Sequence, residues 1–325
     1  MVSARVTTTH KTNLGRNAPR SFRTYFNAMA NGLTMDLAAS SESLALMSVL
    51  GVTVRFGGIL ALDGIEFDVA RGQICGLIGP NGAGKTTLFN CMNRLYHYQS
   101  GDILFEGQSI KATPTHQVAR LGMGRTFQNL AIFRSMPVRD NVLVGAHSRS
   151  FCGFLSSALR LPRVQAEERR LRERADEIMD YLGLSPFRDR LVGDLPFGTQ
   201  KRVELGRALA ADPKLLMLDE PAAGLNHEEL DALAQLIRDL RDRLKITVLL
   251  VEHHMSLVMG VSDHIVVLNF GRKIAEGPPG LIQSHPDVIE AYLGAQSART
   301  AHPQAADPRP AALDYGTGGS HGQVA

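Results

Sequence analysis

The sequence lacks a strong charge imbalance, a cysteine framework and a long apolar run. Its 325 residues carry 35 Lys and Arg against 32 Asp and Glu, a formal net charge of +3, so no whole-chain field favours a nucleic-acid partner. Cys75, Cys91 and Cys152 show neither paired metal spacing nor a disulfide framework, which fits a reducing compartment. No apolar run approaches the roughly 20 residues that span a bilayer.

The two ends of the chain differ in composition from its middle. Residues 1–45 contain five basic residues before the first acid, Asp36, and are rich in Ser, Thr, Asn and Ala. This composition resembles a transit peptide, but without an amphipathic stripe a disordered arm or a start codon placed too early is favoured. Residues 295–325 are rich in Pro, Ala, Gly and His and are predicted to be a disordered tail.

Between these ends, short Val, Ile and Leu runs alternate with longer segments of helical period. The clearest predicted strands are 74–78, 215–218, 246–251 and 264–268. Apolar residues from Leu171 to Leu182 recur at helical spacing among many charges, and the stretch 130–207 is expected to be mostly helical. The alternation predicts an α/β fold, a sheet covered by helices.

A glycine-rich segment follows the first of these strands and precedes a helix-like stretch, 88–95. It consists of Gly79, Pro80, Asn81, Gly82, Ala83, Gly84, Lys85, Thr86 and Thr87. This is the strand, loop and helix order of a P-loop, in which glycines turn backbone N–H groups toward phosphate oxygens. Lys85 is expected to reach the β- and γ-phosphates, Thr86 to bind Mg²⁺, and Thr87 to donate to the α-phosphate.

Two adjacent carboxylates end the strand 215–218. Successive residues of a strand point to opposite sides, so Asp219 and Glu220 need not share a role. Asp219 is expected to hold Mg²⁺, directly or through water, and Glu220 to act as the general base that activates the attacking water. An acid pair after a strand is a weak signal alone; the upstream P-loop gives it this meaning.

With these motifs the chain resembles the nucleotide-binding domain of ABC transporters, over residues 46–294. The resemblance implies a P-loop NTPase fold: a mixed sheet core, an antiparallel β subdomain and a helical subdomain at about 130–207. Phe56 matches the adenine-stacking aromatic, and Gln128 the glutamine that senses Mg²⁺ and the attacking water. His253, rather than the adjacent His254, matches the switch histidine that contacts the γ-phosphate, and residues 223–226 match a dimer-contact loop.

The signature segment departs from the Leu-Ser-Gly-Gly-Gln pattern of that family. It reads Leu-Pro-Phe-Gly-Thr-Gln over residues 195–200, so Pro196 lacks the usual serine hydroxyl. Gly198 is retained at a helix start, where its N–H can still face a phosphate. Thr199 is a candidate to replace the missing hydroxyl in part.

The resemblance also implies cofactors and partners. Two nucleotide-binding subunits, identical or different, would enclose two ATP molecules with Mg²⁺, each P-loop facing the other subunit's signature helix. Closure would act on transmembrane permease subunits through the region after Gln128, with a periplasmic binding protein acting indirectly and no nucleic acid involved. The expected location is peripheral, at the cytoplasmic face of the inner membrane.

Within the family, the chain is most similar to the importers of branched-chain amino acids. The segments that carry this similarity are 127–129, 141–144 and the closing 288–294. Arg134, Pro137 and Asp140 depart from the expected residues where partner contacts should lie. Importers of urea or short-chain amides, and the lipopolysaccharide exporter, use similar subunits and stay open as alternatives.

Two other classes fit less well. A soluble ABC ATPase acting on DNA or ribosomes usually carries two cassettes or a large inserted module, and one cassette is visible here. A P-loop kinase or GTPase would lack the signature segment, and the GTPase would carry an Asn-Lys-x-Asp motif that this sequence lacks. We therefore expect a transport ATPase.

Overall fold

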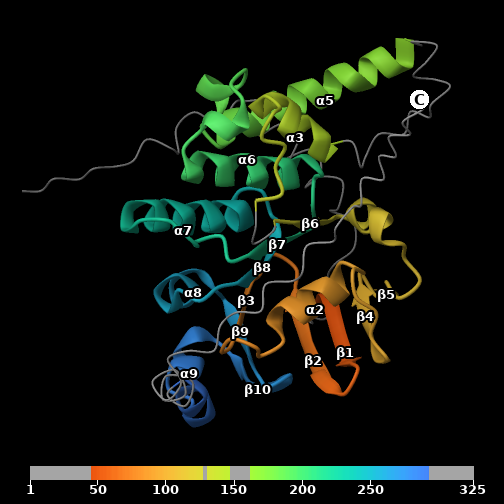
Figure 1. The fold of residues 1–325 in the computed structure, drawn as a ribbon, viewed down its shortest axis with the longest axis vertical. Helices are drawn as coiled ribbons and strands as arrows, with labels where there is room; N and C mark the ends of the chain where they lie inside the picture. Colours follow the sequence, from red (N-terminus) through yellow and green to blue (C-terminus); the bar gives the residue numbers. More distant parts are fainter. Residues whose placement is uncertain (1–44, 127–129, 147–161, 293–325) are drawn as a thin grey trace, which may run out of the picture.

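The computed structural model describes residues 45–126, 130–146 and 162–292 (Figure 1). Most of the predicted arm and tail, together with Gln128, Cys152 and the closing residues 293–294, lies outside these ranges. The strands are β1 (Ala45–Phe56), β2 (Ile59–Ala70), β3 (Ile74–Ile78), β4 (Ser100–Phe105), β5 (Gln108–Ser109), β6 (Met123–Arg125), β7 (Leu215–Asp219), β8 (Thr247–Val251), β9 (His264–Asn269) and β10 (Arg272–Gly277). The helices are α2 (Lys85–Met92), α3 (Val138–Ala146), α5 (Pro162–Tyr181), α6 (Phe197–Ala210), α7 (His227–Asp242), α8 (Met255–Val261) and α9 (Pro279–Gln283), with short 3₁₀ turns at Thr115–Leu121, Ser185–Phe187 and Val192–Asp194.

A six-stranded sheet in the order β10-β9-β3-β8-β7-β6 forms the centre of the molecule. Its neighbours pair in parallel except β10, which returns antiparallel to β9. Every residue of β3, β7 and β8 is buried, as expected for parallel strands covered on both faces. This arrangement carries the ends of β3 and β7 to the same edge of the sheet, where the glycine loop and the acid pair follow.

A second, four-stranded antiparallel sheet has the order β2-β1-β4-β5. Inward apolar residues alternate with exposed ones along β2, the pattern of a sheet with one solvated face. Figure 1 shows β1 and β2 beside the end of the central sheet that carries β9 and β10. An ion pair of 2.7 Å between Arg272 and Asp63 joins the two sheets there.

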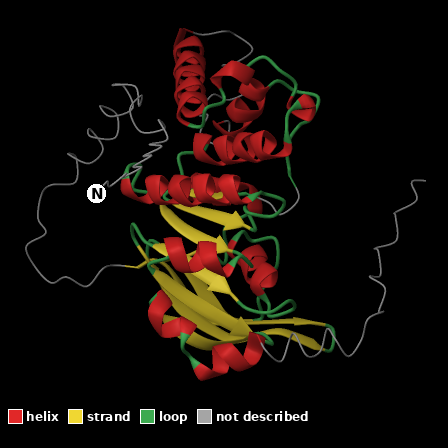
Figure 2. Ribbon diagram, turned by 90° about the vertical axis from the view of Figure 1, so that its left-hand side faces the viewer, coloured by secondary structure: helices red, strands yellow, loops and turns green. Residues whose placement is uncertain are grey.

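Helices α3, α5 and α6 form the end of the molecule opposite the strands (Figure 2). The apolar face predicted between Leu171 and Leu182 lies mainly on α5, which buries Ala175, Ile178 and Met179 in one cluster with residues of α3 and α6. Helix α6 runs to Ala210, and Ala208, Leu209 and Ala210 pack against that cluster.

Cys75 on β3 and Cys91 on α2 are free thiols in the core. Burial raises the pKa of Cys75 to about 12 and that of Cys91 to about 11. Both therefore stay protonated near neutral pH and pack as small apolar side chains.

Helices α3 and α6 approach so closely at Gly145 that an added Cβ would lie 1.9 Å from the carbonyl oxygen of Arg207. Gly145→Ala must push the two helices apart and should lower the free energy of unfolding by about 1–3 kcal/mol. Gly260→Ala on α8 is the matched control, because no atom lies within 4 Å of the new methyl and alanine favours the helix. Urea unfolding of both variants tests the packing; equal stability would contradict it.

Candidate functional site

The glycine loop runs from β3 into α2 as the sequence predicts. Gly79, Gly82 and Gly84 adopt φ values of 152°, 79° and 100°, which favour glycine. Gly84 is the N-cap of α2, and no side chain caps this helix, so its first N–H groups face the loop without a side-chain acceptor. A helix start of this kind binds phosphate groups.

Lys85 is the cation of the loop, with a residue exposure of 5%. Its Nζ donates to the carbonyl oxygens of Gly79 at 2.8 Å and Pro80 at 3.0 Å. Burial lowers the pKa of the Lys85 ammonium, while the charges of Glu220 and Asp219 raise it. Among the described residues both hydrogen-bond acceptors of the ammonium are neutral carbonyl groups, and a charged phosphate oxygen would be a stronger acceptor.

Asp219 at the end of β7 has a buried ionic partner. Arg125 Nη2 donates to Asp219 Oδ2 at 2.9 Å, and both side chains are less than a tenth exposed. The other end of the guanidinium donates to Asn90 Oδ1 on α2 at 2.8 Å and lies 5.6 Å from the ring centre of Phe89. Arg125 therefore links β7, α2 and β6, the strand that leads toward Gln128.

Glu220 and His253 meet across the ends of β7 and β8. His253 Nε2 lies 2.8 Å from Glu220 Oε1. Glu220 has φ 48°, a conformation that costs a non-glycine residue about 1–3 kcal/mol. Its backbone is held on both sides, since its N–H donates to Val251 O at 2.9 Å and its carbonyl accepts from Lys201 Nζ at 3.3 Å.

The histidine loop is shaped by Glu252, which is 1% exposed. Glu252 Oε1 accepts from the N–H of Ala222 at 2.6 Å, and Oε2 accepts from the N–H groups of His253 at 2.9 Å and His254 at 3.3 Å. One buried carboxylate thus joins the turn after Glu220 to the turn that carries His253. His254 instead serves as the N-cap residue of α8.

The start of α6 holds the signature segment. Pro196 is the N-cap residue, and Gly198 lies so close to Glu229 that an added Cβ would be 2.7 Å from its carboxylate. The Thr199 hydroxyl is buried and accepts from Arg202 Nη2 at 3.2 Å, so within one chain it points into its own helix. The contact of Thr199 with ATP bound to a partner subunit therefore stays a prediction.

Asn226, in the predicted dimer-contact loop, has a definite local role. Its Oδ1 accepts from the N–H of Glu229 at 2.9 Å, and its own N–H donates to Glu229 Oε2 at 3.0 Å. This capping box begins α7.

Phe56, the predicted adenine-stacking residue, lies at the end of β1. It is 46% exposed, and its ring lies edge-on to Tyr96 at a centroid distance of 5.3 Å.

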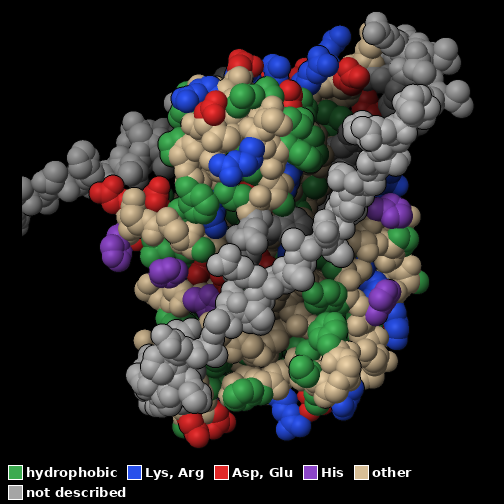
Figure 3. All heavy atoms as spheres, in the orientation of Figure 1, with side chains coloured by type: hydrophobic (Ala, Val, Ile, Leu, Met, Phe, Trp, Pro, Cys, Tyr) green, Lys and Arg blue, Asp and Glu red, His purple; other side chains and the backbone are tan. Residues whose placement is uncertain are grey.

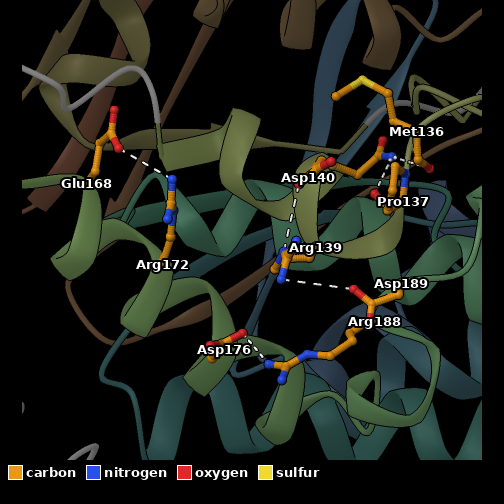
Figure 4. Close-up of polar contacts among 10 residues, drawn as sticks. Met136, Pro137, Arg139, Asp140, Glu168, Arg172, Asp176, Arg188 and Asp189 are labelled. Atoms are coloured by element: carbon orange, nitrogen blue, oxygen red, sulfur yellow. Dashed lines mark hydrogen bonds and ion pairs between the residues drawn. The ribbon is translucent and has the colours of Figure 1, made fainter. Parts of the chain in front are cut away.

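The loop 133–137, expected to face a partner, is fixed by Asn141. This buried side chain accepts from the N–H of Phe133 at 2.9 Å and donates to the carbonyl oxygens of Phe133, Met136 and Pro137 at 3.0–3.2 Å. Pro137 also forms an isolated antiparallel β-bridge with Leu191. Figure 4 shows Arg139 pointing to Asp140 and Asp189, at 3.8 and 3.9 Å.

Charges of both signs are interspersed on the surface. Figure 3 shows Lys and Arg together with Asp and Glu on one face, without a single large field of either sign. Within the described ranges no group of three His, Cys, Asp or Glu side chains could hold a metal by itself. Mg²⁺ needs only one or two protein oxygens when phosphates and water complete its shell, so Thr86 and Asp219 fit that donor set.

Comparisons with known proteins show the family of this chain. The family described as "ABC transporter" matches residues 62–223, and "Branched-chain amino acid ATP-binding cassette transporter" matches residues 272–298. The chain is 45% identical over 252 residues to the high-affinity branched-chain amino acid transport ATP-binding protein BraF of Pseudomonas aeruginosa, covering 78% of this chain and 99% of BraF. The chain belongs to the ABC transporter ATP-binding family.

Another relative and a solved structure also show that the chain is an ABC cassette. LivG of Escherichia coli K12, a high-affinity branched-chain amino acid transport ATP-binding protein, is 43% identical over 78% of this chain and 99% of LivG. A crystal structure of the ADP conformation of an ABC transporter cassette aligns with TM-score 0.68 and 32% identity over 77% of this chain and 99% of that one. The predicted fold class is confirmed, and the cassette is an ATPase.

Three residues of the ABC cassette site were missed by the sequence analysis: Arg125, Lys201 and Glu252. Arg125 lies in the quoted segment before Gln128, but its partner Asp219 is 94 residues away. Lys201 and Glu252 stand beside quoted motifs, and only the tertiary fold brings them to Glu220 and Ala222. The only signal in the sequence was that each is a charged residue next to a motif.

Arg125→Met should leave the Asp219 carboxylate buried without its ionic partner. The free energy of unfolding should fall by about 3–5 kcal/mol, the usual effect of breaking a buried pair. Arg71→Met is the matched control, since Arg71 and Glu106 form an ion pair of 2.6 Å that is a third or more exposed and should contribute about 0–1 kcal/mol. Urea unfolding compares the two; a similar small loss in both would contradict the structural role of Arg125.

Proposed function

We propose that this chain is the ATP-hydrolysing subunit of an importer for branched-chain amino acids. The observation that carries the proposal is the convergence of the Lys85 loop with the Glu220–His253 contact at one edge of the sheet. The similarity to BraF and LivG supports the cargo. ATP binding follows from the family. We also propose a role for each site residue.

The phosphate loop would bind the triphosphate of ATP. The free N–H groups at the start of α2 face phosphate oxygens, and Lys85 exchanges its two carbonyl acceptors for the β- and γ-phosphates. Thr86 and Asp219 would hold Mg²⁺, which when bound neutralises charge on the phosphate oxygens. The Thr87 hydroxyl would donate to the α-phosphate.

Glu220 would orient and deprotonate the water that attacks the γ-phosphate. His253, 2.8 Å away, would orient the Glu220 carboxylate and contact the γ-phosphate. The strained backbone of Glu220 fixes the direction of its side chain before substrate binds. Gln128, outside the described ranges, would complete the site beside Mg²⁺ and the water.

A second cassette would complete each site. Gly198 lies in the first turn of α6, whose N-terminus has no side-chain cap and would face the γ-phosphate of ATP bound to the partner subunit. Phe56 would contact adenine, and Thr199 would contribute only if its hydroxyl leaves Arg202. Because each chain has one loop and one signature helix, neither site closes without dimerisation.

Transmembrane permease subunits would be the partners that carry the amino acid. In the described parts of this chain no helix has the length and apolar character needed to cross a bilayer. The exposed side chains of Phe133, in the loop fixed by Asn141, and of Leu191, which pairs with Pro137 of that loop, would meet the permease. The chain would then lie at the cytoplasmic face of the inner membrane, and a periplasmic binding protein would deliver the cargo to the permease.

The chain would consist of a cassette, residues 46–294, and two terminal extensions.

Glu220→Gln should lower the ATP turnover number by about a hundredfold or more while ATP still binds, because the amide cannot accept the proton of water. Glu276→Gln is the control, since Glu276 also contacts a histidine, His264, at 3.0 Å but on the β9–β10 hairpin. Phosphate release and ATP binding are measured on both variants. Turnover of Glu220→Gln near that of the wild type would reject Glu220 as the general base.

The cargo is tested in the assembled transporter with its permease and binding protein in proteoliposomes. Leucine, isoleucine or valine should stimulate ATP hydrolysis and accumulate inside the vesicles. Stimulation by urea or short-chain amides alone would retain the mechanism and reject the cargo. Failure to assemble with any permease would support a soluble ATPase instead.

A further inference from the structure

A cavity of about 350 Å³ lies against the phosphate loop. Residues 82–87 of the loop form one side of it. Residues 59–61, at the start of β2, and residues 270–271, at the tip of the β9–β10 hairpin, form the rest. Phe56 is not among the lining residues; the large apolar side chains that line the cavity are Ile59, Leu60 and Phe270.

Phe270 occupies an unfavourable position in its hairpin. It and Gly271 form a two-residue connection between β9 and β10, with φ values of 44° and 78°. A turn with two left-handed residues prefers Asn-Gly, since asparagine tolerates this conformation better than other side chains. A phenylalanine here strains the backbone.

The ring of Phe270 is also 84% exposed, the highest exposure of any large apolar side chain in the described ranges. Neither the turn nor the core gains from an aromatic ring at this position. A strained and exposed aromatic residue beside this cavity is a candidate for a ligand contact.

The hairpin tip is held firmly against its neighbours. Gly271 N–H donates to Ala83 O in the phosphate loop at 3.1 Å, and its carbonyl accepts from the N–H of Asp63 at 2.8 Å. Arg272 pairs with the Asp63 carboxylate at 2.7 Å. The backbone of the hairpin tip, from which the Phe270 side chain projects, is thus held against the phosphate loop and β2.

We propose that Phe270 is a second aromatic contact for the nucleoside part of the bound nucleotide, in addition to Phe56. The inference rests on the proposed function, because it requires phosphates in the loop. A nucleotide held there extends into the same cavity, where Ile59 and Phe270 offer apolar surface to the ribose and base. Aromatic rings bind bases by stacking on their π faces.

Phe270→Asn is the decisive variant because it creates the preferred Asn-Gly turn. Without ligand, the melting temperature of the full chain should stay the same or rise. Binding of ADP, measured by titration calorimetry, should weaken about fivefold to tenfold, the lower part of the range for loss of base stacking. Lower affinity together with undiminished stability separates a ligand contact from a structural role.

Inorganic tripolyphosphate is the second probe, since it has the phosphates without the nucleoside. Its affinity should be the same in the wild type and in Phe270→Asn. Phe270→Tyr should restore ADP affinity to within about twofold, because stacking tolerates the added hydroxyl. Ile289→Asn, which changes another exposed apolar residue to asparagine, should leave ADP affinity unchanged.

Three results would overturn the inference while leaving the proposed function intact. One is unchanged ADP affinity in Phe270→Asn; another is an equal loss of ADP and tripolyphosphate affinity, which would place the effect in the loop. The third is a loss confined to ATP-driven dimerisation, which would make Phe270 a contact between subunits. Failure of the wild type to bind ADP would instead overturn the proposed function, and this inference with it.

Discussion

The close approach of two neighbouring backbones to the phosphate loop is the constraint on which the rest of the site depends. A Cβ at residue 79 would lie 2.1 Å from the carbonyl oxygen of Leu268 on β9, and one at residue 84 would lie 2.8 Å from that of Ala61 on β2. Glycine at both positions lets the loop lie between the two sheets. This placement directs the start of α2 and Lys85 toward the carboxylates that follow β7.

Buried charges hold the surrounding parts of the site in place. Asp219 is neutralised by Arg125, and Glu252 accepts three backbone N–H groups from two separate turns. These contacts act where little water competes, so each orients its partners more strongly than a surface contact would. The carboxylates of Asp219 and Glu252 are therefore fixed in orientation in the nucleotide-free chain.

The sequence predicted the features that depend on neighbouring residues. The central strands, the glycine loop and the acid pair were readable because burial on both faces, glycine spacing and strand ends leave local patterns. It did not predict the Arg125–Asp219 pair, the Glu252 contacts or the Lys201 contact to Glu220, because each joins elements that are distant along the chain. The capping role of Asn226 was available in the sequence, since Glu229 follows three residues later, and was overlooked in favour of a dimer contact.

The signature helix shows the limit of a single chain. Its N-terminus has no side-chain cap, and Gly198 packs beside Glu229 of the same chain. Under the proposed function, hydrolysis needs two cassettes, with each loop completed by the signature helix of the other.

The most direct test is the ATPase rate of the purified chain, measured per subunit over a wide range of protein concentration, with molecular mass followed by light scattering. If hydrolysis needs two cassettes, the specific activity rises with concentration as the dimer forms with ATP and Mg²⁺. A constant specific activity from a chain that remains monomeric would contradict it.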